Sequence, residues 1–140
     1  MVVGIVCFGG KSEKLERDYI RIHIIANSNE TQDQKLKYKV KDAVVEFLST
    51  ELAKVNDVVQ AKTVVQEKMD SINQIVTKTL NQNSVFYGAR TELKKEKMPT
   101  RAYDDLILRA GKYETLVITL GDGRGDNWWC VIFPNVCFAN

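Results

Sequence analysis

His23 is the only histidine of the 140-residue chain, so catalysis by a Ser-His or Cys-His pair would have to use it. It lies in the alternating stretch 19–25, on the side opposite the isoleucines, where a hydrogen-bonded structural histidine is the default interpretation. Asp104 and Asp105 are adjacent and would point to opposite faces of a strand. The Thr-Gly or Ser-Gly of aspartic proteases does not follow them. These residues by themselves assign no catalytic group.

Cys130 and Cys137 are separated by six residues and can form either a disulfide or two thiols. No histidine and no other cysteine pair lies nearby, so a four-ligand zinc site cannot be assembled locally. In an oxidising compartment the two sulfurs could close a short loop around Pro134, which would stabilise the fold by about 2.5 kcal/mol. In a reducing cytosol they would be buried thiols, and the sequence leaves this choice open. We expect no metal and no cofactor.

The glycine cluster Gly121, Gly123 and Gly125 has the composition of a phosphate-binding loop, but the Lys-Ser/Thr of nucleotide loops is missing. An aromatic strand follows it instead of a helix, which favours a hairpin turn. The last fourteen residues, 127–140, hold both tryptophans, two of the three cysteines and one of the two prolines. Such a block indicates a staple or a contact surface. Its adjacent tryptophans would face opposite ways in a strand, although burial of both stays an alternative.

Composition places the chain among single-domain globular proteins, with 44% apolar and 27% charged residues. A net charge of +2 gives no reason to expect nucleic acid or an anionic membrane as a partner. The stretch 2–10 is almost wholly apolar but too short to span a bilayer, which needs roughly 20 residues. It is either the remnant of an export signal or a short buried or disordered start. We expect residues 1–18 to be this remnant and a connector, and residues 19–140 to be one domain.

Hydrophobic periodicity predicts how that domain is built. Two amphipathic helices follow a first strand; Thr31 and Gln34 could form a capping box for one helix, and Asn56 or Asp57 could cap the other. The lysines beside the first helical stripe are expected to extend into solvent. Further strands are expected at 85–93, 106–108, 115–120 and 128–133, with a solvated loop at 94–97. This order, β-α-α-β-β-β-β, predicts an α+β fold: a mostly antiparallel sheet with a two-helix hairpin packed on one face.

Three blocks of the sequence carry motifs that occur together in one known family. The first block is 20–28 with Asp-Gln at 33–34, Leu-Lys at 36–37 and Val-Lys-Asp-Ala-Val at 40–44. The second is Met-Pro-Thr-Arg-Ala-Tyr at 98–103, with Ala-Gly-Lys-Tyr-Glu at 110–114. The third contains Gly121 and Gly125, then Asn-Trp-Trp-Cys-Val-Ile-Phe-Pro at 127–134 and Cys-Phe at 137–138. Together they cover most of residues 20–138, and the third block is the most specific. In these blocks the chain resembles the stage II sporulation protein R family of endospore-forming bacteria.

The resemblance implies a developmental signal rather than an enzyme. Members are expected to be exported from the forespore into the space between the forespore and mother-cell membranes. There they activate a membrane-embedded aspartic protease, which cleaves the inactive precursor of a mother-cell sigma factor. Such a protein lies next to a membrane without spanning it, binds no nucleic acid, and could carry a Cys130–Cys137 disulfide.

Aromatic density suggests which residues contact the protease. We expect a contact surface made of the following residues: Arg101, Tyr103, Asn127, Trp128, Trp129, Phe133 and Pro134. The rival interpretation is a hydrolase or a thiol-dependent enzyme that uses His23 together with Cys130 or a carboxylate.

Overall fold

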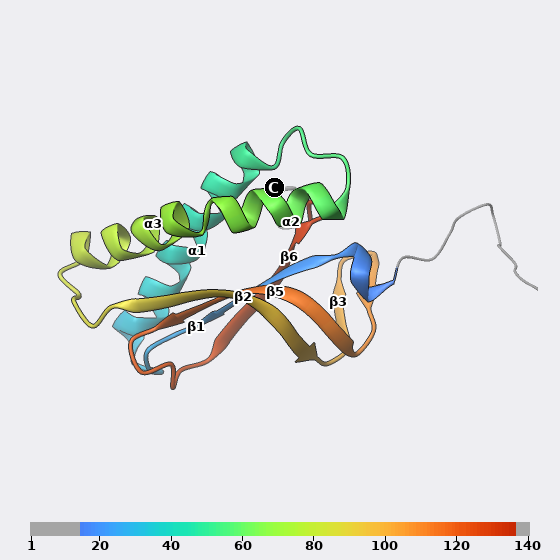
Figure 1. The fold of residues 1–140 in the computed structure, drawn as a ribbon. Helices are drawn as coiled ribbons and strands as arrows, with labels where there is room; N and C mark the ends of the chain where they lie inside the picture. Colours follow the sequence, from blue (N-terminus) through green and yellow to red (C-terminus); the bar gives the residue numbers. More distant parts are fainter. Residues whose placement is uncertain (1–14, 137–140) are drawn as a thin grey trace, which may run out of the picture.

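The computed structural model describes residues 15–136 as a four-stranded sheet with three helices on one face (Figure 1). A short 3₁₀ helix, Glu16–Asp18, comes first. The elements that follow are β1 (Ile20–Ile25), α1 (Thr31–Glu51), α2 (Val58–Glu67), α3 (Met69–Gln82), β2 (Ala89–Met98), β3 (Arg101–Tyr103), β4 (Leu106–Leu108), β5 (Gly111–Leu120) and β6 (Asn127–Phe133). The predicted α+β class is confirmed. The apolar stretch 2–10 and Cys137 lie outside the described residues.

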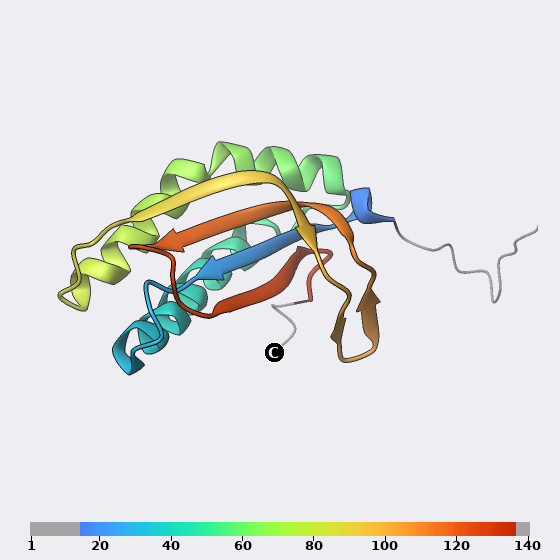
Figure 2. The ribbon, with the colours of Figure 1, turned by 90° about the horizontal axis from the view of Figure 1, so that it is seen from below.

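The strands of the main sheet are ordered β2-β5-β1-β6, and Figure 2 shows them from the side away from the helices. β1 is parallel to β5 and antiparallel to β6, while β2 is antiparallel to β5. β3 and β4 form a separate two-stranded hairpin at one end of this sheet. The first strand of the described residues, β1, therefore lies in the interior of the sheet, between β5 and β6.

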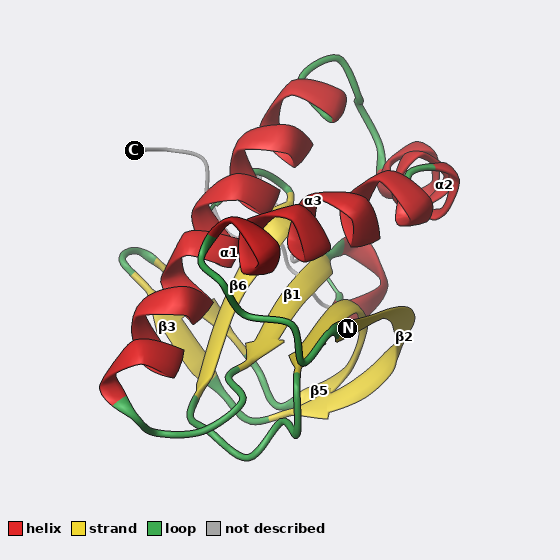
Figure 3. Ribbon diagram, turned by 90° about the vertical axis from the view of Figure 1, so that its left-hand side faces the viewer, coloured by secondary structure: helices red, strands yellow, loops and turns green. Residues whose placement is uncertain are grey.

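The main core fills the space between the helices and the sheet (Figure 3). Every second residue of β1, starting at Ile20, faces the helices and is fully buried. The apolar stripes of the helices meet these isoleucines, with Val44 of α1, Val65 of α2 and Val76 of α3 all fully buried. Alternation along β1 consequently directs its polar residues to the opposite, open face of the sheet. No described helix, within residues 15–136, is long and apolar enough to cross a bilayer.

Several element predictions are wrong in detail. The strand expected at 85–93 begins at Ala89, and β3 was not expected. The second predicted helix is divided at Lys68 into α2 and α3, so the helical layer has three helices. Residues 94–97, expected as a solvated loop, belong to β2, which pairs with β5 from Ala89 to Met98. β2 is an edge strand, and edge strands tolerate many charged side chains, which also discourage pairing with other chains. Charge alone therefore did not distinguish this strand from a loop.

The helix caps give one success and one failure. The Asp57 side chain accepts a hydrogen bond of 2.8 Å from the backbone N–H of Gln60, so the predicted cap of the second helical segment is confirmed. The capping box of Thr31 and Gln34 is wrong, because the cap position is Glu30 and makes no side-chain cap. The Gln34 amide instead donates to the carbonyl of Ser28 and ties the helix start to the preceding loop.

Candidate functional site

The polar residues of β1 point to the open face of the sheet and are nevertheless buried. Arg21 is fully buried and His23 is 8% exposed. In the register of the sheet, His23 lies opposite Val117 of β5 and Trp129 of β6. A buried charge or imidazole on a sheet face needs partners, and these come from four other strands.

His23 is bound to a carboxylate. Its Nδ1 lies 2.8 Å from Oε1 of Glu96, which comes from the edge strand β2. The imidazole meets the Trp129 ring edge-on, with 5.2 Å between ring centroids. The second ring nitrogen, Nε2, is buried and has no hydrogen-bond partner among the described residues. When Nδ1 donates to the carboxylate in the neutral ring, Nε2 holds a lone pair.

Arg21 is a buried cation with few partners. Its Nη2 donates a hydrogen bond of 3.0 Å to the Tyr103 hydroxyl, and its guanidinium lies 4.8 Å from the centroid of the Tyr113 ring. Nε and Nη1 are buried, and nothing in residues 15–136 accepts a hydrogen bond from them. No ion pair joins Arg21 to a carboxylate of the described chain. Burial raises the pKa of Tyr113, and the nearby Arg21 charge acts in the opposite direction.

The β3–β4 hairpin covers this region through two side chains of β3. The Arg101 guanidinium lies 3.8 Å from the centroid of the Trp129 ring, and Tyr103 contacts Arg21. The indole Nε1 of Trp129 is a further buried donor that finds no acceptor in the described part of the chain. We call the set of six residues the open-face cluster: Arg21, His23, Glu96, Arg101, Tyr103 and Trp129.

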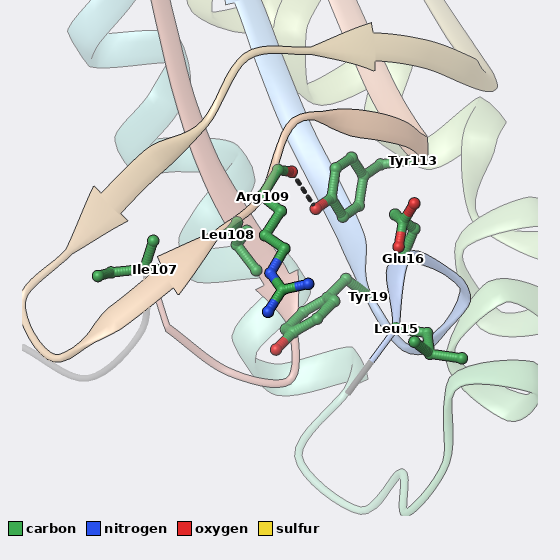
Figure 4. Close-up of a pocket in the computed structure, with 7 residues that line it drawn as sticks. All are labelled: Leu15, Glu16, Tyr19, Ile107, Leu108, Arg109 and Tyr113. Atoms are coloured by element: carbon green, nitrogen blue, oxygen red, sulfur yellow. Dashed lines mark hydrogen bonds between the residues drawn. The ribbon is translucent and has the colours of Figure 1, made fainter. Parts of the chain in front are cut away.

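A cavity of about 230 Å³ adjoins the open-face cluster (Figure 4). Tyr113 connects the two regions, because its ring packs on Arg21 and also lines the cavity. Its hydroxyl donates to the carbonyl oxygen of Arg109, as the dashed line in Figure 4 marks. The full lining is Leu15, Glu16, Tyr19, Ile107, Leu108, Arg109 and Tyr113. The cavity therefore combines apolar walls with ionic and hydroxyl groups.

The sheet divides the predicted contact surface into two parts. Arg101, Tyr103 and Trp129 come together on the open face. Trp128 and Phe133 lie on the helix side, where both are half-buried against the main core. The two tryptophans thus face opposite ways, as predicted. Asn127 is exposed at the start of β6, and Pro134 follows that strand in a turn.

Cys130 lies on the helix side of β6, in the main core. His23 lies on the open face, so the structure does not bring these two residues together. Cys137 is outside the described residues, and the Cys130–Cys137 disulfide stays a prediction. Residues 15–136 contain no group of three or more His, Cys, Asp or Glu side chains arranged to hold a metal ion.

Sequence reasoning missed Arg21, Glu96 and Tyr113. The alternation of β1 contained a signal for the first of these, because Arg21 shares a face with His23, opposite three isoleucines. Glu96 was missed because it was assigned to a loop. Its contact with His23 crosses β5, and such a pairing between distant segments is not visible in local sequence.

A second polar cluster, the loop network, lies where β1 and β5 end. Asp33 of α1 accepts hydrogen bonds from Asn27 Nδ2 at 2.8 Å, Ser28 Oγ at 2.6 Å and the Tyr87 hydroxyl at 2.9 Å. Burial raises the pKa of Asp33, but the three hydrogen bonds outweigh it and hold the pKa below its usual value. Burial and the Asp33 carboxylate both raise the pKa of Tyr87.

The glycine turn 121–126 completes the loop network. Asn27 Oδ1 accepts from the backbone N–H of Asp122 at 2.7 Å, and a Cβ on Gly125 would lie 2.3 Å from the carbonyl oxygen of Ser28. The buried Lys37 donates to Gln34 Oε1 at 2.8 Å and to the carbonyl of Asp126 at 3.2 Å. The turn is therefore part of the scaffold. The predicted hairpin is wrong, because the turn joins β5 to β6, which both pair with β1 and do not pair with each other.

Comparison with known proteins gives one consistent match. Residues 16–140 match the family model described as Stage II sporulation protein R. The chain is 37% identical over 121 residues to "Stage II sporulation protein R" of Bacillus subtilis (strain 168), which covers 86% of this chain and 54% of that protein. The chain thus spans about half the length of this curated relative. No solved structure matches.

Proposed function

This chain belongs to the stage II sporulation protein R family, and from that premise we propose that it is an exported signal of endospore formation. It leaves the forespore and acts in the space between the forespore and mother-cell membranes. Its target is a membrane-embedded aspartic protease, which then cleaves the inactive precursor of a mother-cell sigma factor. The chain acts by contact and performs no chemistry on the protease.

The observation that supports a contact role is the open-face cluster. Arg101 is exposed and stacks on Trp129, a cation–aromatic surface of the kind found at binding hot spots. Beneath it, Arg21 and Trp129 hold buried donors without an acceptor among residues 15–136. Buried donors in folded proteins nearly always have hydrogen-bond partners, so an acceptor from another molecule would complete the bonding of Arg21 and Trp129.

Activation by contact requires that the chain bind one state of the protease more tightly than the other. Aspartic proteases of the retroviral type complete their site from two chains. We therefore propose that binding to the extracellular part of the protease favours its dimer. The predicted Cys130–Cys137 disulfide fits an exported protein, and counting free thiols on the exported chain tests it.

The test is reconstitution in a non-sporulating host. The protease and its sigma-factor precursor are co-expressed, this chain is exported, and precursor cleavage is followed. We expect cleavage that depends on the exported chain, and a loss of about tenfold or more in Arg101→Ala. Arg124→Ala is the matched control, because Arg124 is also exposed but lies in the glycine turn. Equal precursor cleavage with Arg101→Ala and Arg124→Ala would show that the open face does not contact the protease.

One observation supports the alternative that the protein is an enzyme. His23 is paired with the Glu96 carboxylate while its Nε2 is unpartnered within the described chain, as in a histidine oriented for general-base work. The alternative with Cys130 is not supported, since the two residues lie on opposite faces. A washing experiment distinguishes the two functions. The chain is removed from membranes that contain the activated protease, and protease activity is then measured. A protease activated by contact returns to its inactive state, whereas an enzymatically modified protease stays active.

A further inference from the structure

We propose that the open-face cluster is a binding site for a carboxylate side chain of a partner protein, and that the β3–β4 hairpin is its lid. The ligand is an acidic residue with an apolar neighbour, in an extended segment. The identity of the partner rests on the proposed function, but the chemistry of the site rests on this chain alone.

The first step is the charge of Arg21. Removal of a guanidinium from water is costly unless hydrogen bonds and an opposite charge compensate for it. Here Tyr103 accepts one hydrogen bond and Tyr113 offers a ring face, while Nε and Nη1 are left without acceptors among residues 15–136. A carboxylate would supply both the missing acceptors and the missing charge, because arginine and carboxylate form strong charge-assisted hydrogen bonds.

The second step is that the surroundings also favour an anion. Trp129 Nε1 can act only as a donor, and Arg101 adds a second positive charge above it. Glu96 is the carboxylate of this cluster, and it is already bound to His23. Two arginines against one glutamate leave the site with excess positive charge. An incoming carboxylate is therefore complementary in charge and in hydrogen bonding.

The third step is access. The unpartnered atoms are buried, and two of the side chains next to them, Arg101 on Trp129 and Tyr103 on Arg21, come from the three-residue strand β3. β3 pairs with β4 in a two-stranded sheet that is separate from the main sheet. A two-stranded hairpin is marginally stable by itself, so its position depends on its packing against the sheet. This packing includes Arg101, Tyr103 and the buried Leu108 of β4, which lies in a small apolar cluster with Tyr113 and Val131. Displacement of the hairpin exposes Arg21, and the hydrogen bonds of the incoming carboxylate replace the hairpin contacts that are lost.

The fourth step identifies the ligand as part of a protein. The cavity next to Tyr113 has Leu15 and Ile107 on its rim, which are 46% and 67% exposed. A cavity of about 230 Å³ with such a rim accepts an apolar side chain, while Glu16 and Arg109 add one charge of each sign to its wall. Since Tyr113 also packs on Arg21, the apolar and anionic subsites share a wall. A free anion would occupy one of them, whereas an extended acidic peptide segment occupies both.

The two indole N–H signals of the full chain provide the test, because the chain has two tryptophans. Nuclear magnetic resonance assigns them with Trp128→Phe and Trp129→Phe. The probes are acetyl-Leu-Glu-Leu-amide, the same peptide with Gln for Glu, and sodium acetate. We expect the Trp129 signal to move with the Glu peptide at millimolar concentration, at least tenfold less with the Gln peptide, and less with acetate. Trp128, on the helix side, serves as the internal control.

Two variants sharpen the result. Arg21→Met keeps an apolar stem and removes the charge, so the Glu peptide should bind about tenfold or more weakly. Tyr103→Phe removes the lid's hydrogen bond to Arg21, so the same peptide should bind about fivefold more tightly if the hairpin must open first. Weaker binding by Tyr103→Phe would overturn the lid.

A Trp129 shift that is absent, equal for the Glu and Gln peptides, or unchanged in Arg21→Met overturns the site. An equal response to acetate overturns the protein ligand in favour of a free anion. If Arg21→Met does not fold, the comparison of the Glu and Gln peptides on the unaltered chain still decides. No protease is present in this assay, so failure of the proposed function and failure of the site are separate results.

Discussion

Lys37 and Arg21 are both almost completely buried, but they stand in opposite kinds of surroundings. Lys37, in the loop network, donates to two oxygen atoms and lies 4.7 Å from the Tyr38 ring centroid. Arg21, in the open-face cluster, donates to one hydroxyl and leaves two nitrogens without acceptors in the described chain. The first cation holds loops together within the protein. The second one has hydrogen-bonding capacity left for another molecule.

The same contrast extends to the neighbours of these cations. The three donors around Asp33 and the acceptors of Asn27 all have partners, and they join segments from distant parts of the chain. In the open-face cluster, His23 and Trp129 each keep one buried nitrogen without a partner among residues 15–136. Mutations in the loop network should therefore affect folding, and mutations in the open-face cluster should affect binding.

The largest expected effect is at Asp33. Asp33→Ala leaves Asn27, Ser28 and Tyr87 without their acceptor and should lower the free energy of unfolding by about 3 kcal/mol. Asp42 is the matched control, because it is an exposed aspartate of the same helix whose ion pair with Lys41 is at the surface. Asp42→Ala should cost less than about 0.5 kcal/mol. Urea unfolding measures the free energy of unfolding of both variants. Similar losses would mean that the hydrogen bonds of the loop network do not stabilise the fold.

The next effect concerns the glycine turn. A Cβ at residue 125 would meet the Ser28 backbone at 2.3 Å, so Gly125→Ala should cost about 2 kcal/mol or more. Gly88 has φ +80 but open space around it, so Gly88→Ala should lower the stability only through backbone strain, by about 1 kcal/mol. Thermal unfolding of the two variants ranks them. The reverse order would show that the turn adapts and does not fix the loop after β1.

A smaller effect compares the two buried cations directly. Lys37→Met leaves the oxygens of Gln34 and Asp126 without their donor and should cost about 1–2 kcal/mol. Arg21→Met removes a charge that is poorly compensated and should cost less than about 1 kcal/mol, or even stabilise the fold. Unfolding in urea gives both values. A larger loss for Arg21→Met than for Lys37→Met would place Arg21 in the scaffold and break the contrast.

The smallest effect is the pH dependence of the loop network. The pKa of Asp33 in the folded protein lies below its value in the unfolded chain, which is about 3.9. The stability from this shift is complete above about pH 4 and is lost as the pH falls through the folded pKa. Asp33→Asn, which has no proton to take up, should lose less stability than the parent protein below pH 4. Parallel losses in an acid titration of unfolding would contradict this assignment.

The sequence predicts those elements whose signals are local. The stripe of α1 and the cap at Asp57 could be read because neighbours within a few residues determine them. The opposite orientation of Trp128 and Trp129 follows from strand geometry alone. The division at Lys68 was not foreseen because apolar spacing continues across it. The strand at 94–97 was not foreseen because its stability comes from pairing with β5.

The candidate site was predicted in part for the same reason. Trp129, Arg101 and Tyr103 were expected as a surface from their chemistry, and the structure brings them together. Trp128 and Phe133 were grouped with them by sequence proximity, but the sheet separates them. The role of Arg21 depends on a hairpin that begins eighty residues later in the chain, so no local pattern could reveal it.

The place of β1 between β5 and β6 also determines when the protein can fold. β1 is the first described strand to leave the ribosome, but both of its neighbours lie near the end of the described chain. Helices α1 to α3 can form early, whereas the sheet beneath them cannot close until residue 133 is free. Sheets of distant strands fold slowly because long loops must be closed first. The polypeptide therefore keeps its earliest described strand without its neighbours until nearly all of the described chain has been made.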